Sequence, residues 1–230
     1  MADDPQPGMM SKYFGYFLKY KLLDLVMYCL YWVASYFNRQ YCTLAFKLKC
    51  HIHGVGCGKY PRVWGRFLFN KFPGSVISIG NNLVVMSDPR YYALNVYPQS
   101  AFRTLGPNAS IIVGDGVSFN SINIVARSQS IVIGDYTMIG GNCQIMDTDF
   151  HPVWPPENRG KYAGNALDRP IHIGKNVFIG VNVLVLKGVT IGDNSVIAAG
   201  SVVNRAIPAN CMAAGVPARV IKTFENTAGS

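Results

Sequence analysis

His151 is the side chain in this sequence best suited to proton-transfer chemistry, because a neutral imidazole can accept a proton from a hydroxyl group near pH 7. It lies in residues 147–170, a polar, proline-containing stretch in which Pro152 restricts the backbone beside the ring. Asp147 and Asp149 precede it at alternate positions, and one of them, with Asp149 the nearer, is expected to bond the second ring nitrogen. The same two aspartates would also suit the start of a turn. We therefore expect a catalytic base on a loop.

A six-residue repeat surrounds this loop and must position it. Its period fits neither a helix nor a plain strand. It is typical of a β-helix, in which each hexad forms one short strand and a turn, and three hexads complete a triangular coil. Glycine and asparagine follow many of the repeating aliphatic residues and suit the turns. The fold is therefore predicted to be an all-β solenoid. The leading aliphatic residues, expected to point into the core, are Ile173, Ile179, Val185, Ile191, Ile197 and Val203.

The repeat also sets the expected organisation of the chain. It is regular after the loop, recognisable from about residue 75, and interrupted at residues 88–107 by an excursion or degenerate coils. Before it, apolar residues follow helical spacing. We predict a disordered tail at 1–10, a helical and basic extension at 11–74, a β-helix at 75–208 that carries the loop 147–170, and a C-terminal tail at 209–230.

Charge and cysteine content limit the location and the partners. Most of the net charge of +9 lies in the first third of the chain, and no known nucleic-acid motif accompanies it, so anionic lipid is the favoured partner and nucleic acid is not expected. The six cysteines show no CxxC spacing, and there is no cleavable signal peptide. These features predict a reduced, cytoplasmic protein.

The predicted helix within residues 11–37 is apolar or aromatic around most of its surface. Its longest uncharged run, Leu25–Asn38, falls short of the roughly 20 residues that span a bilayer. Aromatic residues with Lys12, Lys19 and Lys21 nearby suit a helix that lies in the membrane interface. Burial against the solenoid or against a neighbouring subunit would cover the same face, and both interpretations stay open.

Three segments, 173–180, 188–203 and 213–222, resemble the hexapeptide-repeat acyltransferases, and the His151–Pro152 pair resembles the galactoside and maltose acetyltransferase branch. Residues 1–75 are loosely similar to the N-terminal extensions of polysaccharide O-acetyltransferases. The resemblance implies a left-handed parallel β-helix, a homotrimer with active sites between subunits, and acetyl-CoA bound along the edge of the prism. It also implies that His151 is the catalytic base.

The resemblance further assigns a substrate-binding role to Asn120 and coenzyme contacts to a set of small and basic residues. Trp154 and Arg159 suit stacking on a sugar and hydrogen bonding to it. This chain has Val181 where the family carries serine, so a backbone N–H must stabilise the oxyanion. It also has Ser128 where the family carries an acidic substrate residue. The residues expected to bind the coenzyme are Gly180, Val181, Gly188, Ala199, Gly200, Asn204, Arg205, Arg219 and Lys222.

Together these features predict an acetyl-CoA-dependent O-acetyltransferase that modifies a sugar hydroxyl of a surface polysaccharide or its lipid-linked precursor at the inner face of the membrane. An N-acetyltransferase acting on an amino-sugar nucleotide and a non-catalytic scaffold are the alternatives. No metal is expected. A β-helical carbonic anhydrase needs three histidine ligands, whereas the solenoid offers only His151 and His172.

Overall fold

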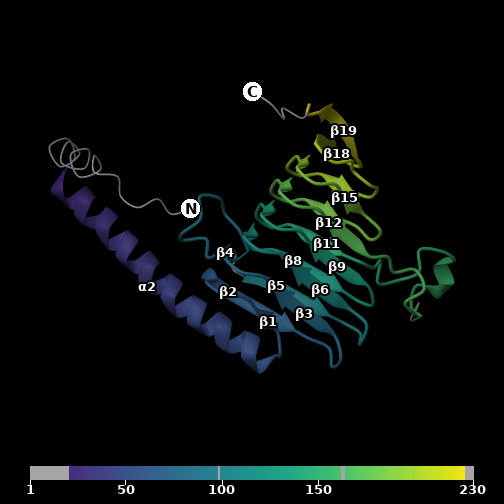
Figure 1. Ribbon diagram of the computed structural model, residues 1–230, viewed down its shortest axis with the longest axis horizontal. Helices are drawn as coiled ribbons and strands as arrows, with labels where there is room; N and C mark the ends of the chain where they lie inside the picture. The colour runs from purple at the N-terminus through teal and green to yellow at the C-terminus, as the bar shows by residue number, and fades with distance from the viewer. Residues whose placement is uncertain (1–20, 98, 162–163, 226–230) are drawn as a thin grey trace. The chain divides into compact units, whose positions relative to one another are not determined.

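A computed structural model describes residues 21–97, 99–161 and 164–225. The expected tail and residues 11–20 of the expected helix lie outside these ranges. The chain divides into two compact units, residues 1–38 and residues 39–230. Three stacks of short parallel strands make up most of the second unit (Figure 1). They confirm the predicted left-handed parallel β-helix with a helix before it.

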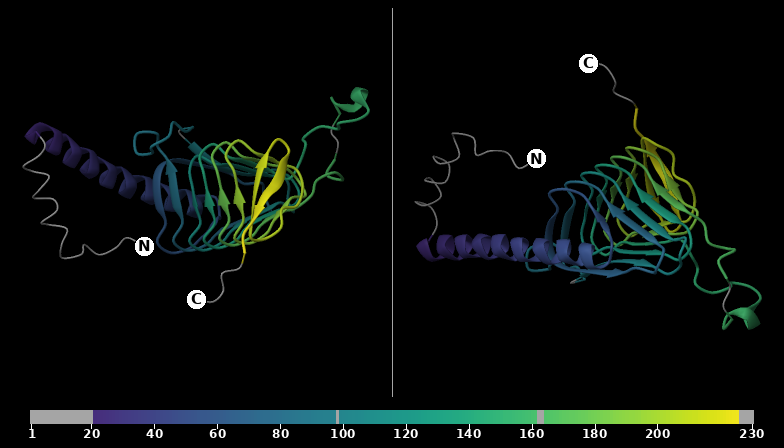
Figure 2. Two further views of the ribbon diagram at one scale, coloured as in Figure 1. Left: turned by 90° about the horizontal axis from the view of Figure 1, so that it is seen from above. Right: turned by 60° about the horizontal axis from the view of Figure 1, so that its bottom comes forward.

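Each coil of the β-helix contributes one strand to each of three parallel sheets, which we call A, B and C in chain order. Figure 2 shows the coils stacked on one another. Sheet A contains β1 (Gly56–Cys57), β3 (Val76–Ile79), β6 (Ser110–Val113), β9 (Ser130–Ile133), β12 (Ile171–Ile173) and β15 (Thr190–Ile191). Sheet B contains the first half of β2 (Arg62–Asn70), then β4 (Val84–Ser87), β7 (Ser118–Phe119), β10 (Met138–Ile139), β13 (Phe178–Ile179), β16 (Val196–Ile197), β18 (Cys211–Gly215) and β19 (Ala218–Thr223). Sheet C contains the second half of β2, then β5 (Gln99–Thr104), β8 (Asn123–Ala126), β11 (Gln144–Met146), β14 (Leu184–Val185) and β17 (Val202–Val203).

The repeating aliphatic residues fill the interior, as their spacing predicts. Ile173, for example, pairs with Ile133 below it and Ile191 above it, and all three are at most 1% exposed. Because one hexad always returns the same position to the same sheet, each aliphatic side chain stacks on its equivalent in the next coil. This burial of aligned aliphatic rows is the main force that holds the coils in register.

The corner between sheets A and B shows why asparagine recurs in the turns. Asn82, Asn176 and Asn194 adopt the left-handed conformation there, with φ of 56°, 53° and 58°. Asparagine tolerates this conformation better than most residues. Gly174, which begins one such turn, cannot carry a side chain because a Cβ atom would lie 2.2 Å from the carboxylate of Asp193 in the next coil. Asparagine and glycine therefore allow tight corners.

Helix α2 (Leu22–Ile52) extends beyond the expected helical stretch, and the coils begin at Gly56 rather than near Ser75. Within the second unit, Phe46 and Cys50 are 1% and 2% exposed, and Phe46 packs edge-on against Phe67 at a centroid distance of 5.1 Å. Gly54 ends the helix with φ of 59°, and the N–H of Val55 returns to the carbonyl of Cys50 at 2.8 Å. This part of the helix thus covers the aromatic end of the core.

Two segments depart from the hexad pattern. Residues 88–97 leave the coils as an excursion, whereas the segment expected to continue it up to residue 107 returns as β5 in sheet C. The C-terminal segment is not a simple tail, because β18 joins sheet B and β19 folds back antiparallel to it. The long loop 147–170 leaves at the corner between sheets C and A and extends away from the coils (Figures 1 and 2).

Candidate active site

The loop 147–170 presents His151 to solvent. Among the residues of the loop that the structure describes, the one regular element is a short 3-10 helix, η1 (Pro156–Asn158). A three-residue turn precedes the imidazole: Phe150 has φ of 62°, and the N–H of His151 donates to the carbonyl of Asp149 at 2.7 Å. A positive φ is unusual for an aromatic residue and is often found at functional sites. The side chain of His151 is exposed, as a residue that meets a substrate must be.

The second limb of the loop orients the ring. Nδ1 of His151 lies 2.9 Å from the carbonyl oxygen of Arg159. A carbonyl oxygen only accepts hydrogen bonds, so Nδ1 carries the proton and donates it. In the neutral ring, Nε2 is then the unprotonated nitrogen and has the lone pair that a general base requires.

Neither aspartate is placed beside the ring by the hydrogen bonds of the loop. Asp149 forms an ion pair with Lys187. Asp147 is fully buried, and its carboxylate accepts the backbone N–H groups of Arg127, Ser128 and Gln129 at 2.8–3.1 Å. Burial raises the pKa of Asp147, and the three N–H donors oppose that rise. In this structure the expected orienting role of an aspartate is taken by the Arg159 carbonyl.

Arg127 and Asp168 belong to this site, although the sequence pattern did not single them out. The guanidinium of Arg127 is paired with the carboxylate of Asp168 at 2.6 Å, and both side chains are almost completely buried. The available signal was the loss of hexad register near Ser128, which places extra residues at the corner from which the loop leaves. Register slips next to a long loop therefore merit attention as anchor sites.

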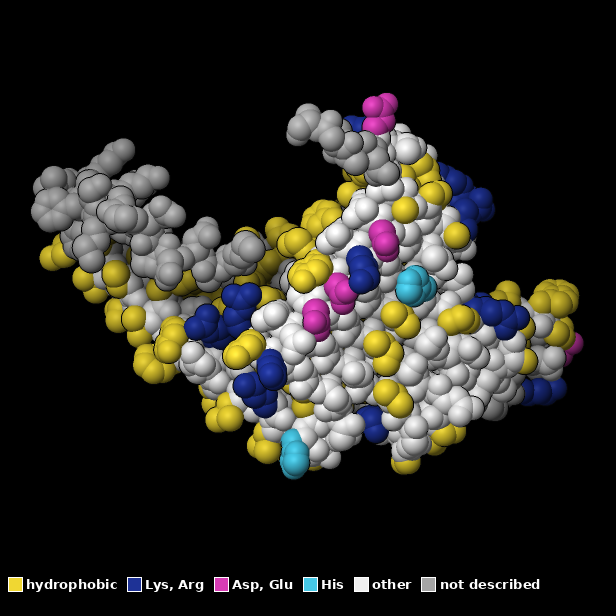
Figure 3. All heavy atoms as spheres, viewed as in Figure 1, with side chains coloured by type: hydrophobic (Ala, Val, Ile, Leu, Met, Phe, Trp, Pro, Cys, Tyr) yellow, Lys and Arg dark blue, Asp and Glu magenta, His cyan; other side chains and the backbone are white. Residues whose placement is uncertain are grey.

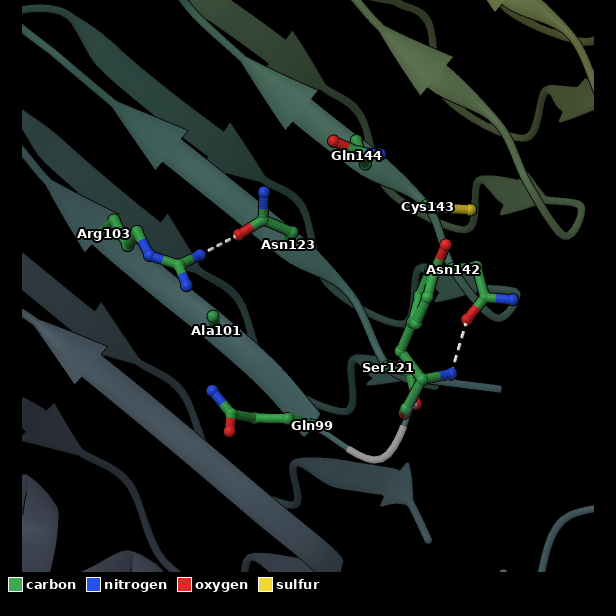
Figure 4. A pocket seen from close by; sticks show the side chains of 9 residues that line it. Gln99, Ala101, Arg103, Ser121, Asn123, Asn142, Cys143 and Gln144 are labelled. Carbon is green, nitrogen blue, oxygen red and sulfur yellow. Dashed lines mark hydrogen bonds between the residues drawn. The ribbon is translucent and has the colours of Figure 1, made fainter. Parts of the chain in front are cut away.

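A polar cavity of about 290 Å³ lies on the outer side of sheet C (Figure 4). Most of the side chains that line it carry an amide or a hydroxyl group. Arg103 is the one charged side chain among the described lining residues. Arg103 donates to the side-chain oxygen of Asn123, and Asn142 accepts the backbone N–H of Tyr97 at 2.9 Å. Such a lining suits a ligand rich in hydroxyl groups. The lining residues are Tyr97, Gln99, Ala101, Arg103, Ser121, Asn123, Asn142, Cys143 and Gln144.

The three residues expected to bind substrate are divided between two places. Asn120 is half-buried at the corner between sheets B and C, directly before the cavity residue Ser121. Trp154 and Arg159 lie in the loop with His151, and Trp154 is 78% exposed. One chain therefore does not bring Asn120 together with the loop residues, since they belong to different corners of the prism.

The residues expected to bind coenzyme also fall on separate edges. Val181, Ala199 and Gly200 lie at the B–C corner, where Gly200 donates to the carbonyl of Val181 at 2.9 Å. Gly180 is buried there, and a Cβ atom would lie 2.6 Å from the backbone nitrogen of Ala199, so its role is stacking of coils. At the C–A corner, on the same edge as the loop, lie Gly188, Asn204 and Arg205, and on β19 lie Arg219 and Lys222; all five are exposed.

The surface at these edges combines open backbone with positive charge. A Cβ atom added to Gly200 would meet nothing within 4 Å, so its backbone is open to a narrow ligand. Exposed Arg205, Arg219 and Lys222 supply positive charge of the kind that phosphates require. Within the described ranges, no group of three or more His, Cys, Asp or Glu side chains is arranged to hold a metal ion.

Comparisons with known proteins bear on the repeat and the fold. Residues 170–205 match the family model described as the hexapeptide repeat of succinyl-transferase. The chain therefore contains the hexapeptide repeat. It is 39% identical over 137 residues to galactoside O-acetyltransferase of Escherichia coli strain K12, covering 54% of this chain and 66% of that protein. It is 36% identical over 133 residues to galactoside O-acetyltransferase of Lactococcus lactis, covering 58% and 62%.

The matches of this hexapeptide-repeat chain thus span just under two thirds of the length of these two relatives. Among solved structures, it is similar to AntD, an N-acyltransferase from Bacillus cereus in complex with dTDP and 3-hydroxybutyryl-CoA. That similarity has a TM-score of 0.55 at 18% identity and covers 79% of this chain and 88% of AntD. At this level of identity, the structural similarity supports the fold alone.

Proposed function

We propose that this hexapeptide-repeat protein is an acetyl-CoA-dependent O-acetyltransferase that modifies a sugar hydroxyl of a surface polysaccharide or its precursor. The observation that carries the proposal is the exposed His151, whose Nδ1–H is directed to the Arg159 carbonyl so that Nε2 can accept a proton. The sequence similarity to two galactoside O-acetyltransferases supports a hydroxyl group on a sugar as the acceptor.

The proposed reaction is a direct transfer. Nε2 of His151 takes the proton from the sugar hydroxyl as its oxygen attacks the thioester carbonyl. A backbone N–H stabilises the tetrahedral oxyanion, because Val181 offers no hydroxyl at the position where the family carries serine. The carbon–sulfur bond then breaks, coenzyme A leaves as the thiolate, and the imidazolium returns the proton to it. No acyl-enzyme is formed.

The division of the candidate residues between two edges supports an active site shared by two copies in a homotrimer. The loop with His151 and the cationic Arg205 belong to one edge, and the cavity with Asn120 belongs to another. Outward-facing side chains of sheet B give the copies an apolar surface, with Met138 53% exposed and Phe178 49% exposed. Packing that surface against another copy would bury it.

The cavity on sheet C is the proposed acceptor site. Its amides and hydroxyls match the hydrogen-bonding groups of a sugar, and Arg103 adds a positive charge with no carboxylate among the described lining residues. A guanidinium in such a site favours a ligand with a carboxylate or phosphate group. We therefore propose an acidic sugar or a sugar phosphate as the acceptor class.

The decisive test is acetyl transfer from labelled acetyl-CoA to candidate glycans, followed by mass spectrometry. His151→Ala is expected to lower the rate by about 10²–10⁴-fold, the usual contribution of a general base. His51→Ala, an exposed histidine on the last turn of α2, is the matched control and should keep the native rate. Full activity of His151→Ala would refute the proposal, and transfer to no acceptor would favour a non-catalytic scaffold.

Amino-sugar nucleotides must be included among the acceptors, since an N-acetyltransferase would use the same base. Acetylation of the amine in preference to the hydroxyl would replace the proposed O-acetyltransferase by the alternative. The same experiment with acidic and neutral sugars tests the acceptor class. Arg103→Gln should raise KM for the acidic sugar about tenfold and leave KM for the neutral sugar unchanged.

The first unit supports attachment to a lipid surface near the inner face of a membrane, where a lipid-linked glycan would be available. Figure 3 shows hydrophobic side chains along helix α2, and Trp32, Tyr36 and Phe37 are each more than half exposed. No helix in the described residues is both long and apolar enough to cross a membrane. Binding to anionic vesicles should be lost in Trp32→Glu/Phe37→Glu; unchanged binding would exclude this role of the helix.

A further inference from the structure

The C–A corner contains a buried ion pair that joins the loop to the coil below it. Arg127 follows β8, and Asp168 lies near the end of the loop. Nε of Arg127 donates to one carboxylate oxygen of Asp168 at 2.9 Å and Nη2 donates to the other at 2.6 Å. This two-point geometry fixes the orientation of both groups. Ser128 adds a hydrogen bond from its hydroxyl to Asp168 at 2.7 Å.

The rest of the guanidinium reaches the loop backbone on both sides of His151. Nη2 of Arg127 donates to the carbonyl of Gly164 at 2.8 Å, and Nη1 lies 3.4 Å from the carbonyl of Phe150. The Phe150 carbonyl belongs to the peptide group whose nitrogen is that of His151. One buried side chain therefore contacts the limb that carries the imidazole and the limb that returns to the coils.

Besides Arg127, the first limb of the loop is held by the ion pair of Asp149 with Lys187 and by the N–H groups bonded to Asp147. Most of the loop side chains at positions 147–161 and 164–170 are exposed, including His151 itself and Arg159, whose carbonyl orients the ring. Buried apolar packing is what usually keeps a segment ordered, and here polar contacts to the corner must replace it. The left-handed Phe150, with φ of 62°, also needs surrounding contacts to persist.

We propose that Arg127, held by Asp168, is a positioning residue for His151, an inference that rests on the proposed function. The forked guanidinium group fixes the position of the Phe150–His151 peptide relative to the returning limb of the loop. In that position Nδ1 of His151 donates to the Arg159 carbonyl and Nε2 faces the acceptor. Lysine cannot reproduce this role, because it delivers one point charge in place of a planar fork. The alternative is that the pair only stabilises the corner.

The variant Arg127→Lys distinguishes a positioning role from a role in stabilising the corner alone. The variant keeps a cation for Asp168 but loses the fork, and we expect kcat to fall about 10–100-fold with little change in KM for acetyl-CoA, as expected for a misplaced catalytic group. Nitrogen NMR of ¹⁵N-histidine-labelled protein reads the tautomer directly. We expect His151 to change from the Nδ1–H form to a mixture of both tautomers.

Arg90→Lys is the matched control. It makes the same change at another guanidinium–carboxylate pair outside the loop, in which Nε and Nη2 of Arg90 donate to Asp88 at 3.0 and 2.7 Å, so it should keep the native kcat and the native His151 tautomer. If Arg127→Lys does not fold, Asp168→Asn tests the same fork by weakening its support, and it should shift the tautomer in the same direction. Native kcat and a native tautomer in whichever of these variants folds would overturn the proposal.

The NMR readout also separates this inference from the function itself. If the native protein transfers acetyl groups to no acceptor, the proposed function fails. The effect of Arg127→Lys on the His151 tautomer would still confirm that the guanidinium positions the ring. Conversely, the native protein can prove active while Arg127→Lys leaves both kcat and the His151 tautomer unchanged. The proposed function would then stand, and the positioning role of Arg127 would be refuted.

Discussion

The A–B and C–A corners of the same prism differ in how they connect the strands. At the A–B corner, glycine and asparagine form short turns, and each aspartate side chain accepts an N–H from a neighbouring coil. Asp135, for instance, accepts that of Asp115 at 3.0 Å, and Asp193 accepts that of Lys175 at 2.8 Å. At the C–A corner, a long loop departs, and the ion pair of Arg127 and Asp168 is buried beneath it.

The comparison shows how a solenoid makes room for chemistry. The A–B corner repeats similar hydrogen bonds at the turns of successive coils, so we expect a change in one coil to leave the others intact. The C–A corner instead concentrates charge in one coil, where burial makes each missing partner costly. We therefore expect the effects of substitution to be large at the C–A corner and small at the A–B corner.

The largest effect is expected for Asp168→Ala. The substitution leaves the guanidinium of Arg127 buried without its carboxylate, a situation that typically costs about 3–5 kcal/mol. Asp193→Ala is the matched change at the A–B corner and removes one exposed hydrogen bond, for which about 0.5–1.5 kcal/mol is expected. Urea unfolding measures both. Equal losses would show that the two corners do not differ in the way described.

The pH dependence of stability should isolate the same pair. Burial raises the pKa of Asp168, but hydrogen bonds from Arg127, Ser128 and Thr148 outweigh it and hold the pKa below its usual value. Its stabilising contribution is therefore complete above the unfolded pKa of about 3.9 and is lost as the pH falls through the lower folded pKa. The difference in unfolding free energy between the native protein and Asp168→Asn should shrink from pH 5 to pH 2.

Asp147 has the opposite effect on the pH dependence of stability. Burial raises its pKa, so as the pH falls from neutral the folded protein binds a proton at Asp147 before the unfolded chain does. It is present in both proteins of the comparison, so its contribution cancels except for the part that the charge of Asp168 adds to its raised pKa. A difference between the native protein and Asp168→Asn that stays constant across the range would show that Asp168 is not held as an anion.

The contrast between the corners also explains how much the sequence alone could predict. The hexad repeat predicts the sheets and the interior positions because it is local: Ile173, Ile179 and Val185 each obey one rule of spacing. The prediction of helix and first coil failed at their boundary, since Gly56–Cys57 and Arg62–Asn70 form coils without clear hexads. There, packing of the aromatic core around Phe67 decides the structure.

At the site, the sequence singled out His151 from its loop and residue type. It did not identify the Arg159 carbonyl, because a backbone group in a loop carries no residue signature. Nor did it identify the pairing of Arg127 with Asp168, which are far apart in sequence and meet only after the coil closes. Contacts of this kind depend on the point at which a non-repeating loop rejoins the coils, and the hexad periodicity does not predict that point.

Phe150→Gly should separate catalysis from stability. Glycine adopts a positive φ without strain, and Phe150 is 39% exposed, so the free energy of unfolding should change by less than about 1 kcal/mol. The turn before His151 becomes looser, and kcat should fall about tenfold. Tyr136→Gly, with φ of 58° at the A–B corner, is the matched control and should keep the native kcat. A native kcat in Phe150→Gly would mean that the turn does not position the base.

The smallest effect is expected for Lys175→Gln at the A–B corner. Nζ of Lys175 lies 2.8 Å from the carboxylate of Asp135, but both side chains are substantially exposed, so water and salt screen the pair. Tm should stay within the scatter of replicate measurements at physiological salt, whereas Arg127→Lys should lower it at every salt concentration because its pair is shielded from solvent. A salt-independent loss of Tm in Lys175→Gln comparable to that of Arg127→Lys would mean that exposure does not distinguish the corners, and that the repeated turns carry more of the stability than their geometry indicates.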